Sequence, residues 1–171
     1  MKRQARSTGF TIVELLMALS IAAVLLAAIA ASVHATLMSY DENEKVSLAT
    51  QAGRWALQRM MSDVRTAAAV DVYSGSMTIV PAENRGIDQI EYYYTNGILY
   101  YKQTVGTETT VEPIVGDREV KLTAFTLNAQ MGTNQEGLSC TARVKARLTF
   151  TVGDETLSMT ASSAPRRNLD L

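Results

Sequence analysis

An uninterrupted apolar run near the N-terminus constrains this 171-residue chain more than any other feature. The run extends over Leu15–Val33 with Ser20 and Ser32 as its only polar residues, and no charged residue occurs between Glu14 and Asp41. A helix of about 19 residues, at about 1.5 Å per residue, approaches the roughly 30 Å thickness of a bilayer core. The sequence therefore predicts one membrane-spanning helix.

The charges around this run predict its orientation. Lys2, Arg3 and Arg6 precede the run and no cation follows it closely, which predicts a cytoplasmic N-terminus and an extracytoplasmic head. A cleaved secretory signal also begins with cations, and small residues near Ala31 could form its cut site. The apolar part of such a signal is usually only about 7 to 15 residues long, and it carries no carboxylate such as Glu14 at its entrance. A carboxylate at the hydrocarbon edge costs about 2 kcal/mol or more without a partner, so we expect the partner of Glu14 to lie outside its own chain.

The residues around this carboxylate also carry a family resemblance. The run Gly9–Leu16, which reads G-F-T-I-V-E-L-L behind a basic leader, resembles the processing and methylation site of type IV pilins and type II secretion pseudopilins. The resemblance implies that a prepilin peptidase cleaves between Gly9 and Phe10 and that the new amine of Phe10 is methylated. Glycine suits a protease cleft because it has no side chain. The amine of Phe10 is a cation that Glu14 of a neighbouring subunit can neutralise in the bilayer, so Glu14 is the predicted assembly residue.

The resemblance also implies a function and a location. It implies that the chain is a single-pass protein of the bacterial inner membrane and that its partners are membrane lipid and other pilin-like or pseudopilin subunits. Major pilins often carry a proline in the membrane helix, whereas the first proline here is Pro81. This absence favours a minor pseudopilin in the assembly or tip complex of a type II secretion system. Trp55–Arg65 and the pair Arg166 and Arg167 resemble the J-type subunits of that group.

Two other functions remain open from the sequence. The chain could be a minor pilin of a type IV pilus or of a DNA-uptake system. From a different class, it could be a membrane-tethered module that binds a ligand through its tyrosines and never enters a filament.

The predicted fold is α+β and type IV pilin-like, with a long N-terminal helix packed on an antiparallel β-sheet head. We assign residues 1–9 to the leader, 10–36 to the membrane half of the helix, 37–70 to its extracytoplasmic amphipathic half and 71–171 to the head. The helix is expected to reach about Ala68, because no proline and only Gly53 interrupts it. Trp55 is expected to be buried. Apolar residues at spacings of three and four predict the stripe that contacts the head: Val46, Ala49, Gly53, Leu57, Met60, Met61, Val64 and Ala68.

The clearest strand signal in the head is a hairpin. Asn96 and Gly97 separate Ile87–Thr95 from Ile98–Gln103, and this dipeptide favours a type I′ turn because both of its residues accept a positive φ. A two-residue loop pairs Thr95 with Ile98, and it places one set of side chains on a single face: Ile90, Tyr92, Tyr94, Leu99 and Tyr101. We interpret these aromatic residues as sheet packing rather than as a binding surface.

A second strand is predicted by strict alternation. Apolar residues from Val144 to Val152 alternate with polar ones, among them the basic row Arg143, Lys145 and Arg147, which we expect on a solvated sheet face. A turn at residues 153–155 leads into a strand with Leu157, Met159 and Ala161 directed inward. The segments 132–137 and 139–141 are interpreted as a loop.

The composition argues against an enzyme and against nucleic acid as the main partner. The only histidine, His34, lies at the end of the apolar run, so no catalytic triad or histidine metal site is expected in the head. The lone Cys140 is expected in the core. The acids Asp88, Glu91, Glu112, Asp117 and Glu119 lack the spacing of a calcium loop, and we predict no cofactor. Loss of the leader leaves 13 basic and 17 acidic side chains, a net charge of 13 − 17 = −4, whereas phosphate binding needs clustered cations.

Overall fold

The computed structural model of the chain describes residues 11–82, 86–116, 121–133, 137, 139–153 and 155–165. This part of the chain contains one long helix, α1 (Ile12–Arg65), followed by strands. It divides into two units, Met1–Asp41 and Glu42–Leu171, and the second unit holds residues 42–65 of α1 together with all of the described strands. The expected α+β, type IV pilin-like architecture is confirmed: a long N-terminal apolar helix packs on antiparallel β-sheets.

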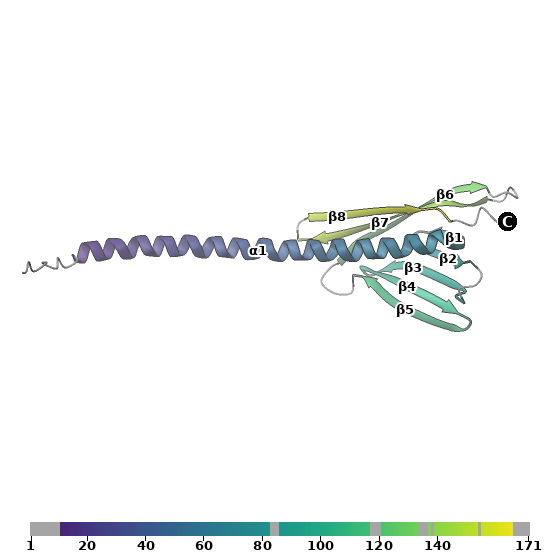
Figure 1. Cartoon of the computed structure of the whole chain (residues 1–171), viewed down its shortest axis with the longest axis horizontal. Coiled ribbons are helices and arrows are strands. Elements are labelled where there is room, and N and C mark those ends of the chain that lie inside the picture. The colour runs from purple at the N-terminus through teal and green to yellow at the C-terminus, as the bar shows by residue number, and fades with distance from the viewer. Residues whose placement is uncertain are drawn as a thin grey trace, which may run out of the picture. The chain divides into compact units, whose positions relative to one another are not determined.

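The strands of the second unit form two antiparallel sheets (Figure 1). The larger sheet has its strands in sequence order: β1 (Ala67–Tyr73), β2 (Ser76–Pro81), β3 (Gln89–Thr95), β4 (Ile98–Val105) and β5 (Glu108–Val115). The smaller sheet has the order β6 (Lys121–Thr133), β7 (Ser139–Val152) and β8 (Glu155–Ser163). The head thus contains two sheets, a division that the sequence pattern did not reveal.

Residues 42–65 of α1 supply the centre of the hydrophobic core. The predicted apolar stripe is confirmed from Ala49 to Val64, and Ala56 joins it as a further buried residue. Gly53 is buried because the second sheet comes so close that a Cβ atom there would lie 2.9 Å from Cε2 of Phe150. Both sheets therefore pack on the same stretch of helix, and their inward side chains complete the core: Met77, Ile79, Ile90, Tyr92, Leu99, Leu122, Val144, Leu148 and Phe150.

The helix ends at Arg65, before the expected Ala68. Thr66 closes the last turn, because its amide donates to the carbonyl oxygens of Ser62 and Asp63, each at 3.2 Å. The hydroxyl of Thr66 also donates to these two carbonyls, at 3.2 and 3.3 Å. Since these bonds satisfy carbonyl groups that a helix end leaves unpaired, the chain can begin β1 at Ala67, and Ala68 contributes to a strand instead of the helical stripe.

The predicted hairpin is confirmed in both turn and register. Asn96 and Gly97 have φ angles of 51° and 82°, as a type I′ turn requires. Thr95 pairs with Ile98, and the predicted pairs follow from there down to Glu91 with Lys102. The short loop fixes the register, and the register then sends Tyr92 and Leu99 into the core.

Two local predictions are wrong and several elements were missed. Ser139–Thr141 begins β7, and it pairs with the end of β6, which includes Gly132 and Thr133, so neither stretch is the predicted loop. Residues 134–136 of that predicted loop lie outside the described residues. Trp55 is 52% exposed, because the two sheets pack on other sides of the helix and leave this one open. Strands β1, β2, β5 and β6 were not predicted, whereas the alternation of β7, the inward face of β8 and the burial of Cys140 are confirmed.

Candidate functional site

Glu14, the predicted assembly residue, lies in the first turn of α1. The amide of Glu14 donates to the hydroxyl oxygen of Thr11 at 3.2 Å, and the amide of Leu15 donates to the carbonyl oxygen of Thr11 at 3.1 Å. Thr11 is therefore the N-cap of the helix, and Glu14 is its third residue. A threonine followed three residues later by a glutamate is the sequence signature of a capping box. That signal is present in the sequence, although Thr11 was not predicted as the N-cap.

The capping geometry explains only part of the role of Glu14. An acid in the first turn is favoured by the partial positive charge at a helix N-terminus, typically by about 0.3 to 1 kcal/mol. The side chain of Glu14 is nevertheless exposed in the isolated chain, directly beside a long apolar surface. Gly9 and Phe10 lie outside the described residues, so the structure places Glu14 and leaves the proposed cleavage site undescribed.

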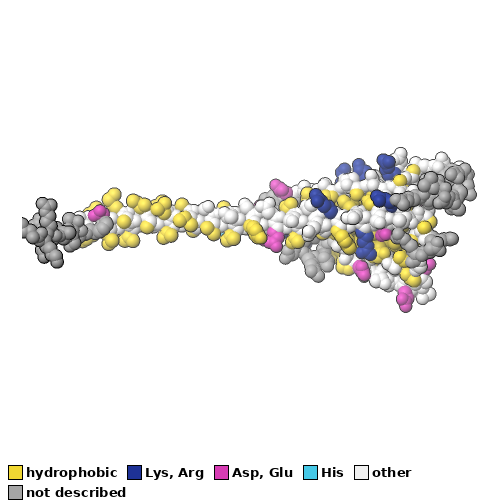
Figure 2. All heavy atoms as spheres, in the orientation of Figure 1, with side chains coloured by type: hydrophobic (Ala, Val, Ile, Leu, Met, Phe, Trp, Pro, Cys, Tyr) yellow, Lys and Arg dark blue, Asp and Glu magenta, His cyan; other side chains and the backbone are white. Residues whose placement is uncertain are grey.

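The apolar surface of the first unit has no cover within the described chain. Every residue from Thr11 to Asp41 is exposed, and the large apolar side chains keep between 53% (Val33) and 79% (Ile12) of their surface accessible. Figure 2 shows these side chains along the N-terminal part of α1. The helix is long and apolar enough to cross a membrane, by its length and composition. An exposed apolar surface of this extent marks a site of contact with lipid or with other proteins.

Two hydroxyl groups in this segment are satisfied inside the helix. Ser20 donates to the carbonyl oxygen of Leu16 at 2.8 Å, and Thr36 donates to that of Ser32 at 2.9 Å. Such bonds lower the cost of placing a hydroxyl in hydrocarbon, where water cannot accept the bond. Ser20 within the run, and Thr36 just after it, are therefore compatible with an apolar environment around the helix.

Residues 4–30 match the family model of the prokaryotic N-terminal methylation motif. The motif indicates a type IV pilin-like protein, and the match covers residues 4–9 of the predicted leader, the predicted cleavage site and most of the apolar run. It implies processing by a prepilin peptidase and assembly with other pilin subunits. Neither a curated protein nor a solved structure matches the chain. The methylation motif and the apolar helix together fit a membrane-anchored pilin-like protein.

The tyrosines of the head belong mainly to its core. Tyr92 and Tyr101 are 0% and 6% exposed, and their ring centroids lie 5.4 Å apart in an edge-to-face contact. The hydroxyl of Tyr92 donates to Oδ2 of Asp63 at 2.7 Å. Burial, and then the negative charge of Asp63, raise the pKa of the Tyr92 phenol above its usual value. These buried rings are not available to a ligand, which supports the structural interpretation of the cluster.

The exposed Trp55 lies beside Arg59 on the open side of α1. The guanidinium carbon of Arg59 lies 5.5 Å from the ring centroid of Trp55 and 3.9 Å from that of Tyr101. A hollow of about 310 Å³ adjoins this group and is also lined by Gln58, Ser62 and Asp63. Sequence reasoning missed this exposed tryptophan because average burial does not say which side of a helix its neighbours cover.

Acids, histidine and cysteine do not converge on a metal site in the described residues, where no group of three or more such side chains is found. Of the acids considered for calcium, Asp117 and Glu119 lie outside the described chain. Asp88 instead accepts a bond from the backbone amide of Gly106, and Glu91 pairs with Lys102 at 3.1 Å. These two carboxylates therefore stabilise the turn and the sheet.

Proposed function

We propose that the chain is a minor pseudopilin, a structural subunit of a type II secretion pseudopilus that supports protein export. The observation that supports this proposal most directly is the methylation motif at residues 4–30, followed by an apolar helix that is exposed on all sides. The further choice of a minor pseudopilin depends on the sequence between Ile12 and Arg65, which forms one helix without a proline. Membrane helices of major pilins, by contrast, often contain that residue.

The proposed processing site is the bond between Gly9 and Phe10. Cleavage removes the basic leader and leaves a new amine, which is then methylated, at the start of the segment that Thr11 caps. The amine of Phe10 in one subunit would pair with the carboxylate of Glu14 in its neighbour. This pair neutralises two charges in the bilayer and favours one axial offset between subunits.

N-terminal sequencing and intact mass of the membrane-extracted protein test the processing step. We expect the mature chain to begin at an N-methylated Phe10. A mature terminus near Ser32 or Val33 would identify an ordinary secretory signal and would contradict the proposed membrane anchor.

Glu14→Gln tests the assembly step, because it keeps the size of the side chain and removes its charge. We expect normal membrane insertion and normal cleavage after Gly9, with reduced co-purification with other pilin-like subunits and reduced protein export. Glu44→Gln is the matched control, since Glu44 is exposed on the same helix beyond the apolar run. Unchanged co-purification and export in the Glu14 variant would exclude the charge-pairing mechanism.

Deletion of the gene for this protein distinguishes a type II secretion pseudopilus from a type IV pilus or DNA-uptake system. A pseudopilin predicts that secreted hydrolases are retained in the periplasm, whereas a minor pilin predicts loss of twitching or of DNA uptake. Retention of hydrolases with normal twitching and uptake is the outcome that the proposal expects.

A further inference from the structure

The two sheets of the head differ in how their edges are protected. An open strand edge presents unpaired backbone groups, and proteins usually guard it with proline, charged side chains or bulges. The outer edge of the larger sheet, β5, carries Pro113, Glu108 and Glu112. The other edge of this sheet, β1, has a register shift between Ala67 and Ala69 and contacts β6 and β7. Both of these edges are therefore guarded.

The smaller sheet is guarded on one side only. Its edge strand β6 contains two register shifts and contacts β1 and β4. The opposite edge strand, β8, pairs with β7 without any shift over Glu155–Ser163, and within the described residues no other strand pairs with it. It contains no proline and no lysine, and its single charge is at its first residue, Glu155. Within the described residues, the edge of β8 is therefore regular and long, and it lacks the features that protect the other edges.

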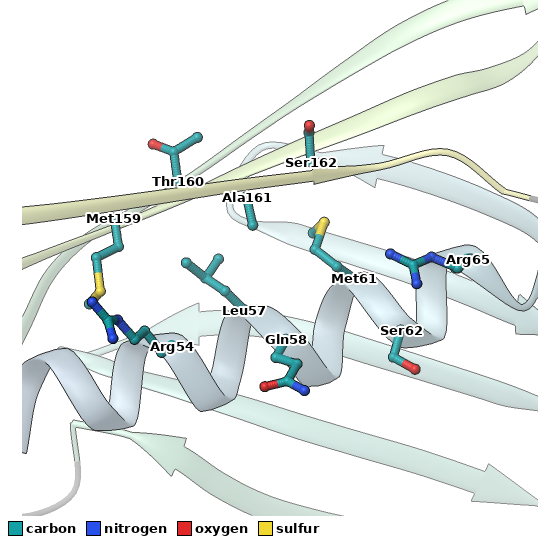
Figure 3. Close-up of a pocket in the computed structure, with 10 residues that line it drawn as sticks. All are labelled: Arg54, Leu57, Gln58, Met61, Ser62, Arg65, Met159, Thr160, Ala161 and Ser162. Carbon is teal, nitrogen blue, oxygen red and sulfur yellow. The ribbon is translucent and has the colours of Figure 1, made fainter.

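A groove runs along this edge between β8 and α1 (Figure 3). The groove has a volume of about 580 Å³, and its apolar lining comes from Leu57 and Met61 on the helix and from Met159 and Ala161 on the strand. The side chains of Leu57 and Met61 extend from α1 toward β8 in Figure 3. The position along a strand edge and the apolar lining suit a chain in extended conformation, whose alternate side chains would enter the groove.

Cations flank both faces of the position that such a chain would occupy. Arg54 and Arg65 line the groove, and neither makes an ion pair or a hydrogen bond with another side chain of the described protein. On the outer face, the basic row Arg143, Lys145 and Arg147 is exposed on β7, one strand away, and Nε of Arg147 donates to the hydroxyl of Thr160 on β8 at 3.3 Å. Neighbouring strands lie about 4.8 Å apart, so a strand added to β8 would lie about 10 Å from this row, within reach of long side chains.

We propose that the edge of β8 binds an extended, acidic segment of a partner protein by strand addition. Backbone hydrogen bonds to β8 provide the pairing, small apolar side chains enter the groove, and carboxylates meet Arg54, Arg65 and the basic row of β7. The partner segment is expected to be acidic because cations lie on both faces of the added strand, and carboxylates would complement their charge. This inference concerns the head alone and does not depend on the filament role.

Binding of synthetic peptides to the full chain in detergent micelles tests the proposal. The probe is a short labelled peptide in which pairs of glutamates alternate with pairs of valines, so that both faces of the extended peptide carry carboxylates and apolar side chains. Fluorescence anisotropy reports its binding. We expect binding that weakens as salt is raised. A peptide with lysine in place of glutamate should not bind, and neither should one with proline in place of valine, which lacks half of the backbone donors. Equal binding of the proline peptide would overturn strand addition, and equal binding of the lysine peptide would overturn the acidic occupant.

Charge-reversal variants then locate the site. Arg54→Glu and Arg65→Glu should each weaken binding of the acidic peptide about tenfold, since attraction is replaced by repulsion. Lys121→Glu is the matched control, with the same charge change at an exposed position of β6. If all three variants weakened peptide binding to the same extent, the effect would come from the net charge of the protein. That result would overturn the assignment of the binding site to the groove.

Amide hydrogen exchange of the same full chain identifies what covers the edge. We expect the acidic peptide to slow exchange in β8 and not at Trp55, on the open side of α1. Protection of β8 in the free protein that grows with protein concentration would show that a second copy occupies the edge. That outcome, or protection confined to the surface around Trp55, would overturn the proposal.

Discussion

The two ends of α1 have the same secondary structure and opposite surroundings. From Thr11 to Asp41 every residue is exposed, although most of them are apolar, whereas Ala49, Ala56 and Met60 are 0% exposed between the sheets. The later part of the helix presents an apolar stripe to its own chain and polar residues to solvent. The first part is apolar around its whole circumference, a pattern typical of a helix that lies in lipid or among other apolar helices. The comparison teaches that one half of this helix is stabilised by its own head and the other half needs an external partner.

The sharpest way to break this comparison is to place one aspartate in each half. Leu57→Asp puts a charge at a position that is 5% exposed, and we expect it to lower the free energy of unfolding of the head by about 4 kcal/mol. The matched variant Leu25→Asp changes a residue that is 58% exposed, so the melting temperature of the head in detergent should stay unchanged. Circular dichroism melts of the full chain measure both.

The same pair of variants should behave in the opposite way in a membrane. An aspartate near the centre of a spanning helix costs about 3 kcal/mol of insertion free energy, so Leu25→Asp should reduce the membrane-bound fraction. A normal membrane fraction for Leu25→Asp, or a normal melt for Leu57→Asp, would contradict the division of the helix into two environments.

Gly53→Ala sharpens the description of the packed half. Alanine favours a helix by about 1 kcal/mol over glycine, but its Cβ would overlap Cε of Met159 on β8 and lie 2.9 Å from Cε2 of Phe150, whose side chain is fully buried. We expect a net loss of about 1 to 3 kcal/mol in the free energy of unfolding. Ser47→Ala, at an exposed position of the same helix, controls for helix propensity and should not destabilise the head. A more stable Gly53 variant would show that the helix and β7 pack less closely.

Tyr92→Phe tests the polar contact that joins the helix to the larger sheet. The variant removes the 2.7 Å bond to Asp63 and should cost about 1 to 2 kcal/mol near neutral pH. Tyr73→Phe is the control, because Tyr73 is 62% exposed. Chemical denaturation of both variants measures the difference, and equal stability would mean that the Asp63 carboxylate gains nothing from the bond.

The same hydroxyl predicts a dependence on alkaline pH. Burial and the Asp63 carboxylate raise the pKa of Tyr92 in the folded protein, whereas an unfolded tyrosine ionises near pH 10. The stability linked to this group is therefore fully present below about pH 10 and is lost as the pH rises above that value, because the unfolded state then binds fewer protons. Tyr92→Phe should unfold with a shallower pH dependence above pH 10 than the unaltered chain.

The smallest effect is expected for the ion pair on the solvated face of the hairpin. Lys102 and Glu91 lie 3.1 Å apart with side chains that are 38% and 26% exposed. Pairs of this kind contribute about 0 to 1 kcal/mol, so Glu91→Gln should change the melting temperature only slightly, and less at high salt. A loss as large as that of Tyr92→Phe would show that the hairpin depends on this pair more than on its buried face.

The elements predicted correctly are those whose signal is local. Asn96 and Gly97 define a turn of fixed length, and that length sets the register of β3 and β4. The alternation of Val144 to Val152 and the spacing of the helical stripe likewise follow from the periods of strand and helix. The missed strands β1 and β5 lack such a period: β1 is rich in alanine, and β5 is exposed over most of its length.

The candidate site divides in the same way. The sequence by itself determined the apolar run, the carboxylate of Glu14 at its start and the methylation motif, because each is a contiguous pattern with a physical meaning of its own. Only the tertiary structure decided that Trp55 is exposed, that Arg54 and Arg65 line one groove with Met159, and that no other described strand pairs with the outer edge of β8. These properties depend on which side of the helix each sheet covers, and that choice is made by contacts between residues far apart in the chain.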